Sequence, residues 1–236
     1  MSNREKLIVA LDVPTLADMQ AVVTAIGDDV TTYKVGHQLF TAAGPAALSF
    51  LKSRGKQVFL DLKLHEIPHS AAQAVRAAGR QGVDMITVHA SGGRQMMQTA
   101  VAAAAEFPDL KVLALTVVTG LSDDDLAEIG FASGVDEQVI RLAKLAKVAG
   151  CQGIIAAPRE IERLKTAVGD DLLIVTPGVR PAGASKDDQR RVGTPFQAIQ
   201  AGAAYIIVGR PIVQASNPAV AARQIVAEIE GNGPAS

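Results

Sequence analysis

The chain has 236 residues, of which 48% are hydrophobic but only 3% are aromatic, so a packed core has to be built from aliphatic side chains. A net charge of -1 and a pI near 6.4 argue against a nucleic-acid polymer or an anionic membrane surface as the main partner. The single cysteine, Cys151, excludes a disulfide framework and any multi-cysteine metal site.

The N-terminal residues lead directly into a strand-like segment, without an apolar signal region. The sequence contains no run of about 18 apolar residues, the length that a membrane span needs. We therefore expect a cytoplasmic protein with no membrane segment.

Short apolar segments rich in β-branched residues recur along the whole chain and predict eight strands. They span residues 7–11, 30–35, 58–62, 85–88, 112–118, 153–156, 172–175 and 205–208. Several of them lack a clean polar–apolar alternation, which is typical of strands that are buried on both faces.

Helix-compatible stretches fill the intervals between these strands, and glycines stand where most of the helices should end. The stretches span residues 15–26, 42–54, 70–80, 92–106, 136–149, 159–168, 195–201 and 218–229. Eight strand–helix units in 236 residues predict an α/β protein with one domain, a (β/α)8 TIM barrel over residues 1–236. A doubly wound open sheet is the alternative, which the lack of GxGxxG after the first strand weakens.

Charged residues gather at the ends of the first three predicted strands, where a barrel of this kind carries its active site. Asp12 ends the first strand, Lys34 lies in the second, and Asp61 and Lys63 share one face of the third. Alternating carboxylates and ammonium groups would hold a lysine protonated and aimed, as a general acid requires. The alternative is a buried ion-pair network that only fixes the register of the barrel.

A phosphate site is predicted where the last two strands end. Gly209 and Arg210 follow the eighth strand, and the seventh runs into a long irregular segment, residues 177–194. Backbone N–H groups and a guanidinium suit phosphate oxygens, although a simple helix-capping turn would explain Gly209 and Arg210 as well. Both sites together predict a small phosphorylated substrate that lies across the barrel mouth.

The histidines and the cysteine point to no metal site. His37, His65, His69 and His89 lack the spacing of known metal-binding motifs, and we expect His89 to be a hydrogen-bonded residue behind the site. Cys151, at the start of the sixth predicted strand, is expected to fill apolar space.

Six segments occur in the order seen in orotidine 5'-phosphate decarboxylases, so the chain resembles that family from Asp12 to Ile212. The segments read ALDVP, YKVG, DLKLHEIPHS, LTVVTG, TPGVRP followed by DDQRR, and VGRPI. The resemblance implies a (β/α)8 barrel that forms homodimers with active sites at the interface. It also implies conversion of orotidine 5'-monophosphate to UMP and CO2, the last step of de novo pyrimidine synthesis, with neither a cofactor nor a metal.

The resemblance also implies roles for the charged residues. Lys63 is expected to donate a proton to C6 of the pyrimidine, and Asp61 to lie against the substrate carboxylate while it holds Lys63 in place. Asp12 and Lys34 are expected to bind ribose hydroxyls and to complete the charge network, and Thr119 to contact the base. A positive group at Lys63 suits this chemistry, because loss of CO2 leaves a carbanion with no electron sink on the ring.

At the phosphate end, the resemblance implies that Gln189, Gly209 and Arg210 hold the phosphate. Arg180 is expected to belong to a loop that closes over the phosphate, which agrees with the long irregular segment.

One segment departs from the family pattern, which usually reads DxKxxDIPNT where this chain reads DLKLHEIPHS. Glu66 stands in place of an aspartate that reaches into the neighbouring subunit's site, so it joins Lys63, Asp61 and Lys34 among the expected catalytic groups. His69 and Ser70 replace Asn and Thr, and the Ser70 hydroxyl is expected still to bind substrate. Because Glu66 keeps the charge, we expect activity to survive.

Two other functions stay open at this point. One is a related barrel that carries out metal-dependent phosphosugar chemistry, and the other is a non-catalytic nucleotide-binding barrel. The LHEIP segment and the DDQRR segment favour the nucleotide enzyme.

Overall fold

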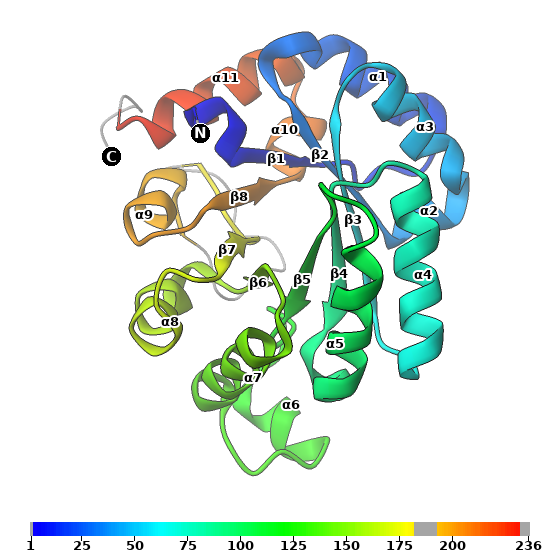
Figure 1. Ribbon diagram of the computed structural model, residues 1–236. Helices are drawn as coiled ribbons and strands as arrows, with labels where there is room; N and C mark the ends of the chain where they lie inside the picture. Colours follow the sequence, from blue (N-terminus) through cyan, green and yellow to red (C-terminus); the bar gives the residue numbers. More distant parts are fainter. Residues whose placement is uncertain (1, 182–192, 232–236) are drawn as a thin grey trace.

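A computed structural model describes residues 2–181 and 193–231, in which eight parallel strands close into a barrel (Figure 1). The strands follow one another around the barrel in chain order: β1 (Leu7–Ala10), β2 (Thr32–Gly36), β3 (Gln57–Leu64), β4 (Met85–His89), β5 (Lys111–Leu115), β6 (Gly153–Ile155), β7 (Leu173–Thr176) and β8 (Tyr205–Val208). Leu7 of β1 pairs with Ile206 of β8, which completes the ring. The predicted (β/α)8 TIM barrel is confirmed.

Helices surround the barrel on its outside, as Figure 1 shows. They are α1 (Leu16–Ile26), α2 (His37–Ala43), α3 (Pro45–Ser53), α4 (Pro68–Arg80), α5 (Gly93–Ala104), α6 (Asp123–Glu128), α7 (Val135–Ala149), α8 (Ile161–Val168), α9 (Pro195–Gln200), α10 (Arg210–Val213) and α11 (Pro218–Ile229). None of those within residues 2–181 and 193–231 has the length and apolar character that crossing a membrane requires.

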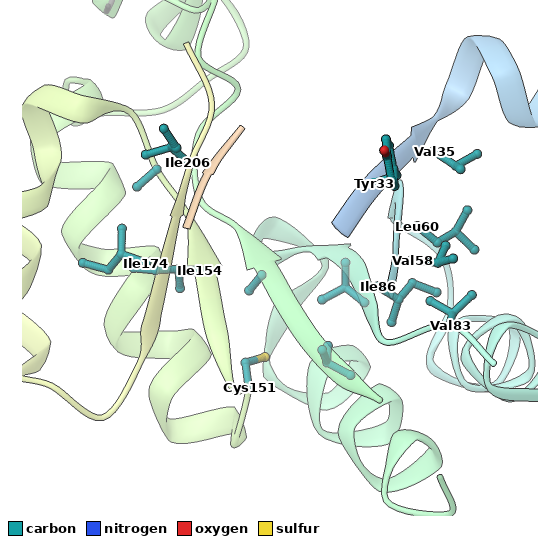
Figure 2. Close-up of a cluster of buried hydrophobic side chains, with 14 of the residues drawn as sticks. Tyr33, Val35, Val58, Leu60, Val83, Ile86, Cys151, Ile154, Ile174 and Ile206 are labelled. Carbon is teal, nitrogen blue, oxygen red and sulfur yellow. The ribbon is translucent and has the colours of Figure 1, made fainter. Parts of the chain in front are cut away.

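Neighbouring residues of a strand point to opposite faces, and this divides the apolar residues into two layers. Ile154, Ile174 and Ile206 belong to the outer layer between the barrel and the helices, part of which Figure 2 shows. The residues that follow them in the chain fill the barrel interior together with members of the other strands: Ile8, Ala10, Phe59, Met85, Leu113, Leu115, Ile155, Val175 and Ile207. Aliphatic side chains therefore dominate both layers, as the composition predicts.

The structure differs from the predicted elements in two places. The helix expected over residues 42–54 begins only at Pro45, as α3, and Gly44 with φ 55 separates it from α2, most of which the sequence did not predict. The fifth strand ends at Leu115 instead of continuing to residue 118, because the chain leaves the ladder there and turns across the barrel mouth. Val118 and Thr119 line the pocket as a result.

Candidate active site

A pocket of about 440 Å³ opens at the C-terminal ends of the strands. Its apolar lining comes from the uppermost interior residues of the barrel, among them Ala10, Leu115, Ile155 and Ile207. Polar side chains line the rest of the pocket, one group from the first three strands and another from the segments after β7 and β8. The pocket therefore joins the two sites that the sequence predicts.

The four charged residues of the first three strands form one continuous array. Lys34 Nζ lies 2.9 Å from Asp12 Oδ1 and 3.7 Å from Asp61 Oδ2, so it bridges the two carboxylates. Asp61 Oδ2 also accepts a hydrogen bond from Lys63 Nζ at 2.8 Å. The alternation of negative and positive groups that the sequence predicts is confirmed.

Asp61 stays ionised despite its burial. Removal from water would by itself raise the pKa of this carboxyl, but the ammonium groups of Lys34 and Lys63 hold it below its usual range. Hydrogen bonds from Lys63 and Thr87 act in the same direction. A buried negative charge is thereby maintained 2.8 Å from Lys63 Nζ, where it orients the side chain expected to act as general acid.

The backbone of β3 is irregular where it carries these groups. Asp61 and Lys63 both face the pocket, as predicted, but Lys63 has a φ of 47, the single positive φ outside glycine in the described residues. This left-handed conformation costs an L-residue roughly 1–2 kcal/mol. The β3–β4 register also shifts between Leu60 and Leu64. Strain of this kind is concentrated at functional sites.

The part of the pocket where the sequence predicts phosphate binding contains Gly178, Arg180, Gly209 and Arg210. Gly209 immediately precedes α10, and Gly178 adopts a φ of 76, which suits glycine. Arg180 is buried, its backbone N–H donates to the carbonyl of Gly193 at 3.0 Å, and its Nη1 donates to Val179 O at 3.1 Å. The predicted residue Gln189 lies outside the described residues.

Glu66 and Ser70 are not brought into this pocket within one chain. Glu66 is exposed, and its Oε1 accepts a hydrogen bond from the N–H of Ile67 at 2.6 Å. Ile67 is 63% exposed, and Ser70 is half-buried in the first turn of α4. Thr119, in contrast, does line the pocket.

Sequence reasoning missed Gln38 and Gln214, which also line the pocket. Gln38 lies two residues beyond the end of β2, and Gln214 directly follows α10. A polar side chain just beyond a strand end was the signal for Gln38. Gln214 carried no comparable signal, because the sequence did not predict the bounds of the short helix before it.

His89 lies behind the charge array. Its Nδ1 is 2.6 Å from Ser91 Oγ, and its ring stacks on His65 with 5.3 Å between centroids. Burial, followed by the neighbouring His65 and Lys63, lowers the pKa of His89. The predicted hydrogen bond of His89 is confirmed. Among the residues that the structure describes, His, Cys, Asp and Glu side chains form no group of three that could hold a metal ion.

Comparison with known proteins places this arrangement in a family. The model of the orotidine 5'-phosphate decarboxylase / HUMPS family matches residues 5–225. The orotidine 5'-phosphate decarboxylase of Moorella thermoacetica is 49% identical over 237 residues, which cover 98% of this chain and 94% of that protein. The one from Trichlorobacter lovleyi is 47% identical and covers 96% of this chain and 95% of its own length.

A solved structure gives the same result. The crystal structure of orotidine 5'-phosphate decarboxylase from Lactobacillus acidophilus superposes with a TM-score of 0.84 at 38% sequence identity, over 98% of this chain and 100% of that one. The charge array therefore occurs in a chain that resembles these enzymes in both sequence and fold over nearly its whole length. The chain belongs to the orotidine 5'-phosphate decarboxylase / HUMPS family.

Proposed function

We propose that this chain is a carboxy-lyase that converts orotidine 5'-monophosphate to UMP and CO2, a step of pyrimidine biosynthesis. The family membership supports the reaction, since its relatives bear the name of that enzyme. The observation that carries the proposal is the array Asp12–Lys34–Asp61–Lys63 in a pocket that is also lined by Arg180 and Arg210. Such a pocket suits a nucleotide with a carboxylate on its base and a phosphate at its far end.

In the proposed mechanism the bond between C6 and the carboxylate breaks, and its electron pair stays on C6 while CO2 leaves. The ammonium group of Lys63 stabilises this carbanion and then transfers a proton to C6. Asp61 orients Lys63 through the 2.8 Å hydrogen bond and lies next to the departing carboxylate. The neutralised Lys63 recovers its proton from solvent, so the cycle is balanced without a redox partner.

The remaining pocket residues bind the substrate in this proposal. Asp12 and Lys34 hold the ribose hydroxyls, and Thr119 contacts the base. Gly209, Arg210 and Arg180 surround the phosphate, and Gln189 joins them from outside the described residues. Binding of the phosphate, far from C6, supplies binding free energy that stabilises the assembled site in the transition state.

The activity is tested by adding orotidine 5'-monophosphate and following the loss of its ultraviolet absorbance, with and without a chelator. We expect turnover that resists the chelator. Turnover that stops with chelation would favour metal-dependent phosphosugar-type chemistry, and binding of the nucleotide without turnover would favour a non-catalytic barrel.

Lys63→Ala is the first variant to compare. Removal of the ammonium group should abolish decarboxylation, because neither carbanion stabilisation nor the proton donor remains, while UMP still binds through its ribose and phosphate. Calorimetric titration with UMP measures the binding. Residual turnover close to that of the wild type would contradict the role given to Lys63.

We also propose that the protein is a homodimer in which Glu66 reaches the partner's pocket. The position of Glu66 supports this, since its exposed carboxylate lies outside its own pocket and beside the exposed Ile67. Mixing Lys63→Ala with Glu66→Ala chains tests it, because a mixed dimer regains one complete site and should recover activity. If the mixture stays as inactive as its components, Glu66 does not act across an interface.

The proposed location of the enzyme is the cytoplasm. The free Cys151, with no disulfide partner in the sequence, is compatible with a reducing compartment. Fractionation of cells that produce the tagged protein tests this, and recovery outside the cytoplasmic fraction would contradict it.

A further inference from the structure

Thr87 lies at the centre of the irregularity in β3. The β3–β4 ladder pairs Leu60 with Ile86 and next pairs Leu64 with Val88, so residues 61–63 lie opposite Thr87 alone. A regular parallel ladder would place one residue opposite each partner. Surplus residues form a bulge, and bulges commonly re-aim side chains next to active sites. Here the bulge contains both Asp61 and Lys63.

The hydroxyl of Thr87 contacts both of these residues. Its Oγ1 accepts a hydrogen bond from the backbone N–H of Lys63 at 2.8 Å and donates one to Asp61 Oδ1 at 2.9 Å. Thr87 itself is 0% exposed and does not line the pocket, so it lies behind the charge array and away from any substrate.

The two oxygens of Asp61 thereby have different partners. Oδ1 is occupied by the Thr87 hydroxyl, while Oδ2 faces Lys63 Nζ at 2.8 Å and Lys34 Nζ at 3.7 Å. This division fixes the rotation of the carboxylate. The second bond of the same hydroxyl fixes the backbone of Lys63 in its left-handed conformation.

We propose that Thr87 is a positioning residue, whose hydroxyl sets the relative placement of Asp61 and Lys63 for the decarboxylation. The inference rests on the function proposed above and adds a residue that does not touch substrate. Without the hydroxyl, the N–H of Lys63 loses its acceptor and the strained backbone loses one of its restraints. A misplacement of about 1 Å in such an assembly costs on the order of 100-fold in rate.

The test compares Thr87→Val, which keeps the shape but removes the hydroxyl, with Thr87→Ser, which keeps the hydroxyl. We expect kcat to fall by about 10- to 100-fold in the valine variant, with KM changed less than about threefold, and serine to restore kcat to within about threefold. If valine prevents folding, Thr87→Ala serves as the variant without a hydroxyl and is expected to show the same loss.

Thr116→Val is the matched control. Thr116 is also fully buried at the C-terminal end of a strand, and its hydroxyl donates to Ile155 O at 3.0 Å without contacting the charge array. Its kcat should stay within about threefold of the wild type. The proposal is overturned by unchanged kcat in Thr87→Val, by a serine variant as slow as the valine one, or by an equal loss in Thr116→Val.

A crystal structure of Thr87→Val separates this proposal from the proposed function. Lys63 is expected to leave the positive-φ region, or its Nζ to leave Asp61 Oδ2, whatever reaction the enzyme catalyses. An unchanged Lys63 and Asp61 would overturn the role of Thr87 even in an active decarboxylase. Conversely, a wild type inactive on orotidine 5'-monophosphate would defeat the proposed function, while the crystal structure still decides the role of Thr87.

Discussion

Gly36 lies so close to the charge array that a side chain there has no room. A Cβ at this position would lie 2.8 Å from Lys34 Nζ and 3.2 Å from Asp12 Oδ1. The φ of -100 is one that alanine adopts freely, and the obstructed atom is the end of a flexible side chain. The backbone can therefore accommodate alanine at position 36, but Lys34 Nζ would have to move out of its present place in the charge array.

We predict that Gly36→Ala lowers kcat/KM by about tenfold or more while the Tm stays close to that of the wild type. Steady-state kinetics and thermal unfolding measure the two effects. Gly120→Ala is the control, since a Cβ there meets nothing within 4 Å and the residue has no positive φ. Equal activity in both variants would show that Lys34 has room to move without loss of function.

His89 should make the stability of the protein depend on pH. Burial, the neighbouring His65 and Lys63 lower its pKa in the folded state, so the unfolded chain binds a proton more readily. The stability from the neutral ring is fully present above the unfolded pKa of about 6.5 and is lost as pH falls through the folded value.

We predict that His89→Gln reduces the loss of unfolding free energy between neutral pH and pH about 5. Urea unfolding at both pH values measures that loss, with His69→Gln as the control on an exposed histidine. The same loss in wild type and His89→Gln would show that His89 does not contribute.

The charged residues of the site could be predicted because charges are rare inside an apolar barrel. A charged residue at the end of an apolar strand segment is also easy to recognise in the sequence. Asp12, Lys34, Asp61 and Lys63 were found in this way. Thr87 was not, because it is uncharged and lies in an apolar strand, and its importance depends on a bulge that leaves no mark in the residue pattern. The role proposed for Glu66 involves a second chain, whose position a single sequence does not give.

At the scale of the elements, Lys56 links the start of β3 to the turn after α1 through hydrogen bonds and an ion pair. Its Nζ donates to the carbonyl oxygens of Gly27 at 2.6 Å and Val30 at 3.1 Å, and it pairs with Asp28 at 3.2 Å. Lys56 is buried and precedes the first residue of β3, so it lies at the end of the barrel opposite the pocket.

We predict that Lys56→Met lowers the unfolding free energy by about 1–3 kcal/mol, because the two carbonyls lose a buried donor. Its kcat should match that of the wild type, since the change is remote from the charge array. Urea unfolding measures the stability, with Lys144→Met on the exposed face of α7 as the control. A loss no larger than in this control would mean that water replaces the ammonium group.

Strands were easier to predict than helix boundaries, and the reason is physical. Each strand is buried on both faces, so its apolar run stands out against the polar loops. The division of residues 37–53 into α2 and α3 depends on a single left-handed residue, Gly44. The pattern predicts a helix only over residues 42–54, so it includes α3 but misses most of α2.

For the whole molecule, we propose that the chain folds as a single domain. One apolar cluster extends around the outside of the barrel from Leu7 to Ile229, which supports a cooperative unit. Cys151 offers a direct probe of it, because it is the single cysteine and is buried in that cluster. Burial also raises the pKa of its thiol to about 12, which leaves little reactive thiolate at neutral pH.

We predict that Cys151 becomes reactive toward a disulfide reagent only as the whole barrel unfolds. The midpoint for thiol labelling in urea should coincide with the midpoint of the loss of helical circular dichroism. Cys151→Ser is the labelling blank. Labelling at clearly lower urea would show that the β6 region opens separately and that the barrel is not one cooperative unit.

The pairing of β1 with β8 has a consequence for synthesis of the protein. Because Leu7 needs Ile206 beside it, the first strand to leave the ribosome waits for the last before its ladder is complete. Until then β1 lacks one of its two neighbours, and unpaired apolar strands are prone to associate with other chains. Closure of the ring thus requires that β8 has left the ribosome, which makes it a late step in the formation of the barrel.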